Sequence, residues 1–203
     1  GFDKDRARDL QNLFCNEYIP PIKNQHVVDG MLEFAKYINL DSNAKWTPLI
    51  LEPEEGFAKE YIHSNKITCL ISPCSSQRYG DQYNRSWSIN NFAALIKYLI
   101  KLENLQIIMT GGNSPPEKAY SKEFDALFGN NILNLIGKTS IREMAALIKH
   151  SDFIISPDSG PAHIATIMGK PVIGLYAMSN PKRTGPYNSD EWLINKYDQA
   201  LKV

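Results

Sequence analysis

Residues 156–187 read SPDSGPAHIATIMGKPVIGLYAMSNPKRTGPY, and the pattern in this stretch sets the expected architecture. The apolar run just before it has the length of a strand buried on both faces. A turn of small residues then leads to Pro161, which suits the first turn of a helix because its missing N–H would be unpaired there anyway. Residues 160–168 read as a short helix that Gly169 can end, and residues 171–176 read as a second buried strand.

The turn Asp158-Ser159-Gly160 has the chemistry of an anion site. Asp158 or Ser159 is the natural cap of the helix, and Gly160 lets a ligand approach the backbone closely. Backbone N–H groups and the positive end of the helix dipole converge above such a turn, which suits a phosphate or pyrophosphate. An ordinary strand-to-helix turn is the alternative, and the turn by itself does not separate the two.

Strands and helices alternate after residue 46. The expected strands are 67–72, 105–110, 132–136, 153–157 and 171–176. The expected helices are 88–102, 115–128, 140–149 and 160–168. Strands joined by helices of this length run parallel with right-handed crossovers, so we expect an α/β fold with a doubly wound, Rossmann-like parallel sheet. In such a sheet, ligands lie at the carboxyl ends of the strands.

Residues 1–45 form a separate part, with a boundary to the sheet domain of residues 46–203. Apolar residues recur there at helical spacing in two stretches, Leu10, Leu13 and Phe14, and then Val27, Val28, Met31, Leu32, Ala35 and Ile38. We therefore expect two helices. His26, beside the second apolar face, could contact a ligand, although a structural role is the more common one. The chain starts at Gly1 without an initiator Met, and we expect a fragment of a longer protein.

Composition excludes several classes of function. The 22 basic and 22 acidic residues leave no polyelectrolyte signature, so we expect no nucleic-acid partner. No apolar run is long enough to span a bilayer. The cysteines, Cys15, Cys69 and Cys74, are odd in number and lack C-x-x-C spacing, which fits a reducing cytoplasm.

Four loops are expected at the carboxyl edge of the sheet, namely 72–87, 110–113, 157–160 and 180–187. Their cationic side chains are Arg78, Arg85, Lys182 and Arg183. The Gly111-Gly112 turn allows a ribose or a flat ring to approach. Each loop alone is unremarkable, but together the guanidiniums, hydroxyls and small-residue turns indicate a pocket for a nucleoside diphosphate.

Several common motifs are missing from the sequence. No G-x-G-x-x-G follows a strand, and no G-x-x-x-x-G-K-[ST] occurs. No His and Cys cluster has zinc spacing, so we expect neither a metal ion nor a cofactor. A hydrolase triad of Ser159, His163 and Asp158 is disfavoured, because Ser159 lacks the G-x-S-x-G elbow and the three residues lie too close along the chain.

Two motifs resemble a known family. DSGPAHIATIMGKPVIGLY followed by NPKRTGPY looks like the C-terminal signature of the ADP-heptose:lipopolysaccharide heptosyltransferases, glycosyltransferase family nine. Ser72-Pro73-Cys74-Ser75-Ser76, leading to Arg85-Ser86-Trp87, resembles the family segment in which small hydroxyl residues precede a basic residue and a Trp. The resemblance covers roughly residues 65–190 and implies the C-terminal domain of a GT-B glycosyltransferase. Residues 1–45 resemble the last helices of the N-terminal, acceptor-side domain.

The resemblance implies roles for three groups of residues. The donor diphosphate would be held by Ser75, Ser76 and Arg85. The diphosphate and the sugar would be surrounded by Asp158, Ser159, Gly160 and His163. The nucleoside would face Gly111, Gly112 and Glu117. Arg85, which stands where the family usually has Lys, and His163 are the expected catalytic residues, and Arg183 would help to hold the departing ADP.

The implied reaction is transfer of a heptose from ADP-heptose to the lipopolysaccharide inner core, with inversion, in the cytoplasm and with at most peripheral contact with the inner membrane. Two departures from the family pattern are visible. The insertion 79–84 lengthens the loop before Arg85, and the family's general base, an Asp of the N-terminal domain, has no counterpart here. This chain alone is therefore expected to bind rather than to catalyse. A nucleotide-sugar 2-epimerase of similar shape and a non-enzymatic nucleotide-binding domain are the alternatives.

Overall fold

The computed structural model of the protein describes residues 1–47, 52–75, 85–187 and 189–202. The chain divides into two compact units. The smaller unit comprises Gly1–Trp46 and Lys182–Thr184, and the larger comprises Thr47–Pro181 and Gly185–Val203.

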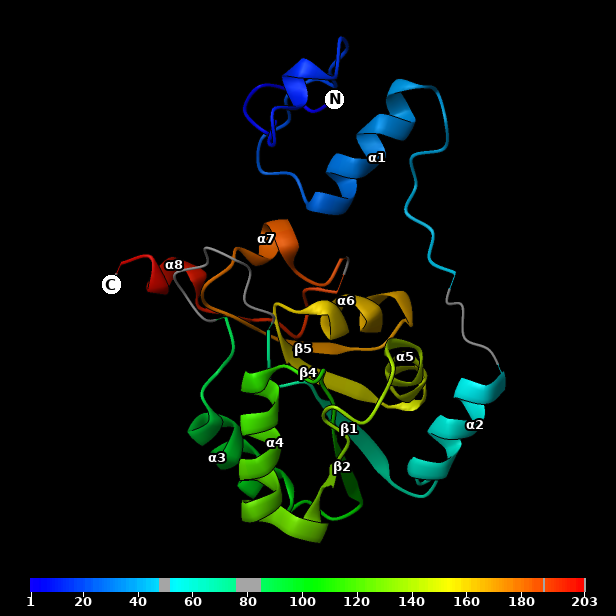
Figure 1. Ribbon diagram of the computed structural model, residues 1–203, viewed down its shortest axis with the longest axis vertical. Helices are drawn as coiled ribbons and strands as arrows, with labels where there is room; N and C mark the ends of the chain where they lie inside the picture. Colours follow the sequence, from blue (N-terminus) through cyan, green and yellow to red (C-terminus); the bar gives the residue numbers. More distant parts are fainter. Residues whose placement is uncertain (48–51, 76–84, 188, 203) are drawn as a thin grey trace. The chain divides into compact units, whose positions relative to one another are not determined.

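A six-stranded parallel sheet with the order β3-β2-β1-β4-β5-β6 lies at the centre of the larger unit (Figure 1). The strands are β1 Ile67–Ile71, β2 Leu105–Met109, β3 Leu133–Asn134, β4 Phe153–Pro157, β5 Val172–Tyr176 and β6 Ile194–Asn195. The central strands β1, β2 and β4 are almost entirely buried, as expected of strands covered by helices on both faces. The doubly wound parallel sheet predicted from the sequence is confirmed.

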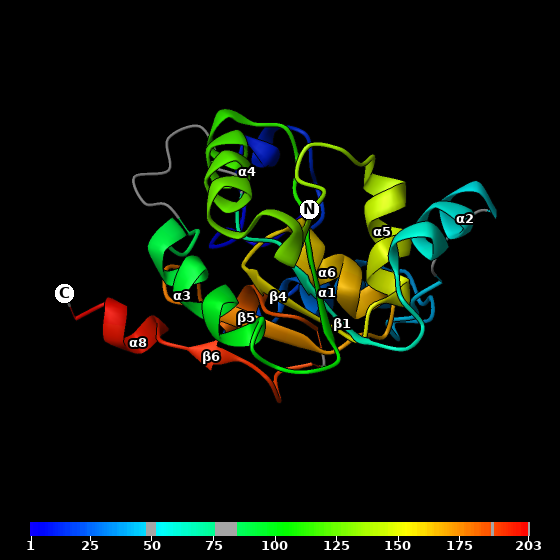
Figure 2. The ribbon, with the colours of Figure 1, turned by 90° about the horizontal axis from the view of Figure 1, so that it is seen from below.

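Helices cover both faces of this sheet (Figures 1 and 2). One face packs against α3 Ile89–Leu99 and α4 Pro115–Phe128 through an apolar cluster that includes Phe92 and Phe124. The other face packs against α2 Glu52–Tyr61, α5 Ile141–His150 and α6 Gly160–Ile167 through a cluster that includes Ala58, Leu147 and Ala165. Each helix presents one apolar stripe to the sheet, which explains why the helical period was readable in the sequence.

Most helix ends follow from local capping chemistry. The hydroxyl of Ser88 accepts a hydrogen bond from the N–H of Asn91 at 3.3 Å, and Ser140 forms the predicted capping box with Glu143. Gly169, beyond the end of α6, has a φ of +67°, the left-handed conformation expected there.

Two short elements differ from the sequence expectations. Strand β3 contains two residues rather than the five of 132–136, and β6 was not predicted at all. Both residues of β6 are exposed, so the strand leaves no alternation of apolar and polar residues in the sequence. Three short elements remain among the described residues after residue 46. They are the 3-10 turn η2 Gly129–Asn131 and the helices α7 Pro181–Thr184 and α8 Tyr197–Ala200.

The direction of winding reverses between β1 and β4. From β1 the chain moves outward through β2 to β3, and α5 then returns it to β4 on the opposite side of β1. Ile71 pairs with Met109 on one side and with Ile155 on the other, so the carboxyl ends of these strands lie at one edge. In sheets of this kind, ligands bind at the carboxyl edge where the winding reverses.

The smaller unit contains η1 Gln11–Leu13 and α1 Val27–Tyr37. The helix expected around Leu10, Leu13 and Phe14 is wrong: the chain makes one 3-10 turn there, and these side chains are 68%, 68% and 84% exposed. Asp9 and Leu10 have positive φ values of 54° and 58°, which are incompatible with a continuous right-handed helix. The second helix, α1, is confirmed.

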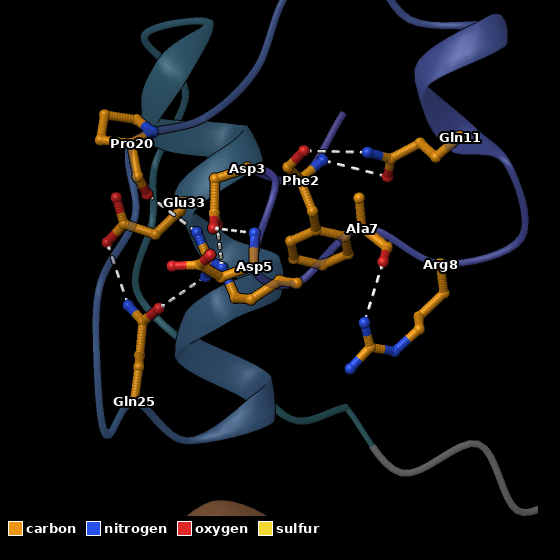
Figure 3. Close-up of polar contacts among 10 residues, drawn as sticks. Phe2, Asp3, Asp5, Ala7, Arg8, Gln11, Pro20, Gln25 and Glu33 are labelled. Carbon is orange, nitrogen blue, oxygen red and sulfur yellow. Dashed lines mark hydrogen bonds and ion pairs between the residues drawn. The ribbon is translucent and has the colours of Figure 1, made fainter.

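Polar contacts join separate segments of the smaller unit (Figure 3). The side chain of Gln11 accepts a hydrogen bond from the N–H of Phe2 and donates to its carbonyl. The guanidinium of Arg6 pairs with Asp3 and donates to the carbonyl of Pro20 at 2.8 Å. His26 caps α1, because its Nδ1 accepts a hydrogen bond from the N–H of Val28 at 3.1 Å, which supports the structural interpretation of this histidine.

Candidate functional site

Two loops meet at the point where the sheet reverses its winding. The loop after β1 contains Ser75, and the turn after β4 contains Asp158. The hydroxyl of Ser75 donates to the backbone carbonyl of Asp158 at 2.7 Å, and the N–H of Ser75 donates to the hydroxyl of Ser86 at 2.8 Å. Ser75 is almost fully buried. It therefore joins the two loops, and its hydroxyl oxygen retains acceptor capacity only.

A buried carboxylate brings two of the predicted residues together. Nη1 of Arg85 lies 3.1 Å from Oδ2 of Asp158, and Nε2 of His163 lies 3.7 Å from Oδ1. The Asp158 side chain is 8% exposed and that of Arg85 is 18% exposed, whereas that of His163 is 46% exposed. The structure thus places the ion-paired guanidinium of Arg85 at one oxygen of the Asp158 carboxylate and the more exposed imidazole of His163 near the other.

The ionisation of Asp158 reflects competing influences. Burial acts to raise the pKa of this carboxyl. The neighbouring His163 and Ser179 side chains, and then hydrogen bonding and charge attraction from Arg85, more than offset burial and lower the pKa below its usual value of 3.8. Asp158 is therefore an anion near neutral pH. The guanidinium of Arg85, 3.1 Å away, offsets this negative charge.

The N-terminus of α6 forms the floor of the site. Ser159 is the N-cap residue, yet within the described part of the chain its side chain makes no capping hydrogen bond, so the expected capping role of its side chain is wrong. Its hydroxyl instead lies 2.7 Å from the hydroxyl of Ser156. The Cα of Gly160 faces open space: a Cβ built there meets no described atom within 4 Å.

The Gly111-Gly112 turn after β2 is closed by Glu117. One carboxylate oxygen of Glu117 accepts from the N–H of Gly112 at 2.5 Å, and the other accepts from the N–H of Ser114 at 3.0 Å. Ser114 and Glu117 form a second capping box, at the start of α4, which the sequence interpretation overlooked. The N–H of Gly137 in turn donates to the carbonyl of Gly111 at 3.1 Å, so the loop after β3 adjoins this turn. The role of these residues toward a nucleoside stays a prediction.

Two further predicted residues are Ser76 and Arg183. Ser76 lies, with the insertion 79–84, outside the described residues. Arg183 is exposed in α7 and belongs to the smaller unit. Their proposed contacts with the donor stay predictions.

The structure also adds a residue that sequence reasoning missed. Tyr176, at the end of β5, is 2% exposed, and its ring lies against Gly174, where an added Cβ would be 2.8 Å from a ring carbon. Burial and the charge of Asp158 raise the pKa of the Tyr176 phenol, while the charge of Arg85 acts in the opposite direction. This phenol is therefore an electrostatic neighbour of the ion pair. A Tyr that ends a buried strand gives no sequence signal beyond core packing.

The described residues contain neither a metal-binding cluster nor a membrane-spanning helix. Among those residues, no group of three or more His, Cys, Asp and Glu side chains could hold a metal ion. None of the described helices is long and apolar enough to cross a membrane.

Residues 1–202 match the sequence model of a protein family, glycosyltransferase family 9 (heptosyltransferase). The chain belongs to this family. Among curated relatives, a lipopolysaccharide core heptosyltransferase, OpsX of Haemophilus influenzae, is 37% identical over 98% of this chain and 56% of its own length. Lipopolysaccharide heptosyltransferase 1 of Salmonella typhimurium is 25% identical over 99% of this chain and 61% of its own length. The chain thus spans somewhat more than half the length of these family 9 relatives, and the resemblance identified in the sequence is confirmed.

Solved structures of family 9 members have the same fold. A family 9 glycosyltransferase from Veillonella parvula matches 95% of this chain and 56% of its own, with a TM-score of 0.76 at 20% identity. The Escherichia coli heptosyltransferase WaaC with ADP matches 96% of this chain and 58% of its own, with a TM-score of 0.68 at 21% identity. At this identity the likeness concerns the fold alone, and it confirms the expected Rossmann-like domain of a GT-B glycosyltransferase.

Proposed function

We propose that this chain is the donor-binding portion of a glycosyltransferase that transfers a heptose from ADP-heptose to the inner core of lipopolysaccharide. Family 9 membership supports the reaction class. The relatives' printed names support the sugar and the acceptor, and the ADP in the WaaC structure supports the nucleotide. The observation that carries the proposal is the placement of Arg85 and His163 around buried Asp158 at the N-terminus of α6, where the sheet reverses its winding.

The proposal divides the work between two parts of the chain. Residues 46–203 would hold the nucleotide sugar, and residues 1–45 would belong to the acceptor-side domain. The acceptor would be a lipopolysaccharide-type molecule, so the enzyme would act in the cytoplasm at the inner face of the inner membrane, with peripheral contact at most. Gly111, Gly112 and Glu117 would lie beside the nucleoside, and Ser76 and Arg183 would add contacts to the diphosphate.

The chemical step would place its largest electrostatic demand on the departing ADP. An acceptor hydroxyl would attack the anomeric carbon from the face opposite the diphosphate, and its proton would pass to a general base, which the family resemblance places in the N-terminal domain. The bond between the anomeric carbon and the diphosphate oxygen breaks, and ADP leaves with the electron pair. Arg85 and the first-turn N–H groups of α6 would meet the charge that develops on this oxygen.

His163 would act as a hydrogen-bonding group toward the donor. One ring nitrogen faces Asp158 at 3.7 Å, and 46% of the side chain is exposed. The other ring nitrogen would contact a ligand seated on the turn. Asp158 would orient the ring, in the way that a carboxylate commonly fixes a histidine through one nitrogen.

The test is product analysis with the complete protein and three substrate mixtures. ADP release from ADP-heptose that depends on a heptose-acceptor lipopolysaccharide core supports transfer. Interconversion of the nucleotide sugar without acceptor would identify an epimerase instead. Binding of the nucleotide sugar with no turnover in any mixture would identify a binding domain, and either of these results would refute the proposal.

A further inference from the structure

Ser156 lies directly behind the Asp158 turn and has no assigned role. It belongs to β4, and its side chain is completely buried. Its hydroxyl lies 3.0 Å from the carbonyl of Pro157 and 2.7 Å from the hydroxyl of Ser159. A hydroxyl has one proton, and the carbonyl of Pro157 accepts only, so both contacts are satisfied when Ser156 donates to Pro157 and Ser159 donates to Ser156.

This arrangement changes what Ser159 does at the start of α6. A serine at the N-cap ordinarily turns its oxygen toward the N–H groups of the first turn. Ser88 and Ser140 do so in this chain, accepting from main-chain N–H groups three residues ahead at 3.3 and 3.2 Å. Ser159 is the N-cap of α6, but its hydroxyl is engaged by Ser156.

The same N–H groups are those that an anion would use. Pro161 provides no N–H, which leaves Gly160, Ala162 and His163 in the first turn of α6. The N–H of Ala162 has a partner in the carbonyl of Ser159, at 3.2 Å. A capping hydroxyl from Ser159 would compete with a phosphate oxygen for this small set of donors.

We propose that Ser156 is a positioning residue for donor binding, because it holds the Ser159 hydroxyl away from the N-terminus of α6 and keeps that terminus open to the diphosphate. The inference rests on the proposed function, which places the diphosphate there. Ser156 itself touches no ligand and acts through Ser159.

The test is the variant Ser156→Ala in the complete protein, with ADP as the probe in calorimetry. Freed from Ser156, the Ser159 hydroxyl is expected to turn toward the first-turn N–H groups and to raise the dissociation constant of ADP about 5-fold, the factor that corresponds to a cap of ordinary strength. The melting temperature should fall little, because a new cap replaces the lost hydrogen bond. An unchanged ADP affinity with a clearly lowered melting temperature would mean that Ser156 is structural only, and would overturn the inference.

A double-mutant cycle separates competition from general damage. In a Ser159→Ala background no hydroxyl is left to compete, so adding Ser156→Ala should change the ADP dissociation constant less than about 2-fold. An equal loss of affinity in both backgrounds would overturn the inference.

Should Ser156→Ala not fold, Ser156→Cys, with a side chain of similar shape and a poor hydrogen-bonding thiol, is expected to weaken ADP binding in the same background-dependent way. A wild-type protein that binds no ADP would refute the proposed function, whereas ADP binding unaffected by these variants would refute this inference alone.

Discussion

Replacing Arg85 with Ala should separate the catalytic role of this guanidinium from its structural one. Nη1 of Arg85 lies 3.1 Å from a carboxylate oxygen of Asp158, and both side chains are largely buried. Loss of one preorganised group that stabilises the departing ADP should lower kcat by ~10²–10³ in the complete enzyme. The variant also leaves the Asp158 carboxylate without its cation, which should reduce the free energy of unfolding by ~1–3 kcal/mol, since His163 and Ser179 still contact it.

The matched control is Arg85→Lys, which keeps the charge and introduces the residue that the family resemblance implies at this position. Lysine lacks the planar fork of arginine, so we expect partial recovery, to within about 10-fold of the wild-type kcat, with most of the stability regained. Acceptor-dependent ADP release gives kcat and KM, and thermal unfolding gives the stability. Full transfer activity in Arg85→Ala would refute the assignment and would make Arg78, which lies outside the described residues, the next candidate. A loss of stability with unchanged kcat would show that Arg85 serves only to neutralise Asp158.

Three further substitutions examine other parts of the structure. His163→Gln should weaken donor binding about 10-fold. The melting temperature should change little, because the His163 side chain is 46% exposed. Unchanged donor affinity with a clearly lowered melting temperature would show that His163 stabilises the fold and does not bind the donor. Hydrogen bonds from Lys149 and His150 lower the pKa of Glu55 to about 2 from a usual 4.5, so the stability gained from this ionised carboxylate is present above pH 4.5 and is lost as the pH falls toward 2. Wild-type protein should therefore lose more stability than Glu55→Gln between pH 4.5 and pH 2 in thermal melts, and parallel curves would contradict the assignment. Gly174→Ala would place a Cβ 2.5 Å from the Leu193 side chain and 2.8 Å from the Tyr176 ring. It should therefore lower the free energy of unfolding, measured with denaturant, by ~1–3 kcal/mol. An unfolding midpoint equal to that of the wild type would show that these side chains move aside without cost.

The sheet and its helices could be predicted because their signals are local. Strand β4 and helix α4 have the expected bounds, since a short buried apolar run and a proline after a serine are each legible within a few residues. The helical spacing of Leu10, Leu13 and Phe14 wrongly predicted a helix. There the backbone of Asp9 and Leu10 takes positive φ values that no side-chain pattern encodes.

The candidate site could be predicted as a set of residues but not as a set of contacts. The Asp158 turn and Arg85 were identified from loop chemistry and family resemblance, yet the ion pair between them joins residues 73 positions apart. The sequence likewise predicted Asp158 or Ser159 as the cap of α6, because both residue types and positions fit, and Ser159 is the N-cap residue. The hydroxyl points to Ser156 instead, and a serine within a buried strand looks like any small core residue until the structure places it.

The most direct test of the central claim is an NMR titration of ADP into the chain, following the backbone amides of the Asp158 turn and α6. The account predicts saturable shifts at Gly160, Ala162 and His163 at up to millimolar ADP, because the diphosphate would accept hydrogen bonds from this helix end. The Arg85→Ala variant should show smaller shifts at the same ADP concentrations. Saturable ADP binding that leaves the amides of residues 159–163 unperturbed would contradict the claim that the N-terminus of α6 holds the donor diphosphate.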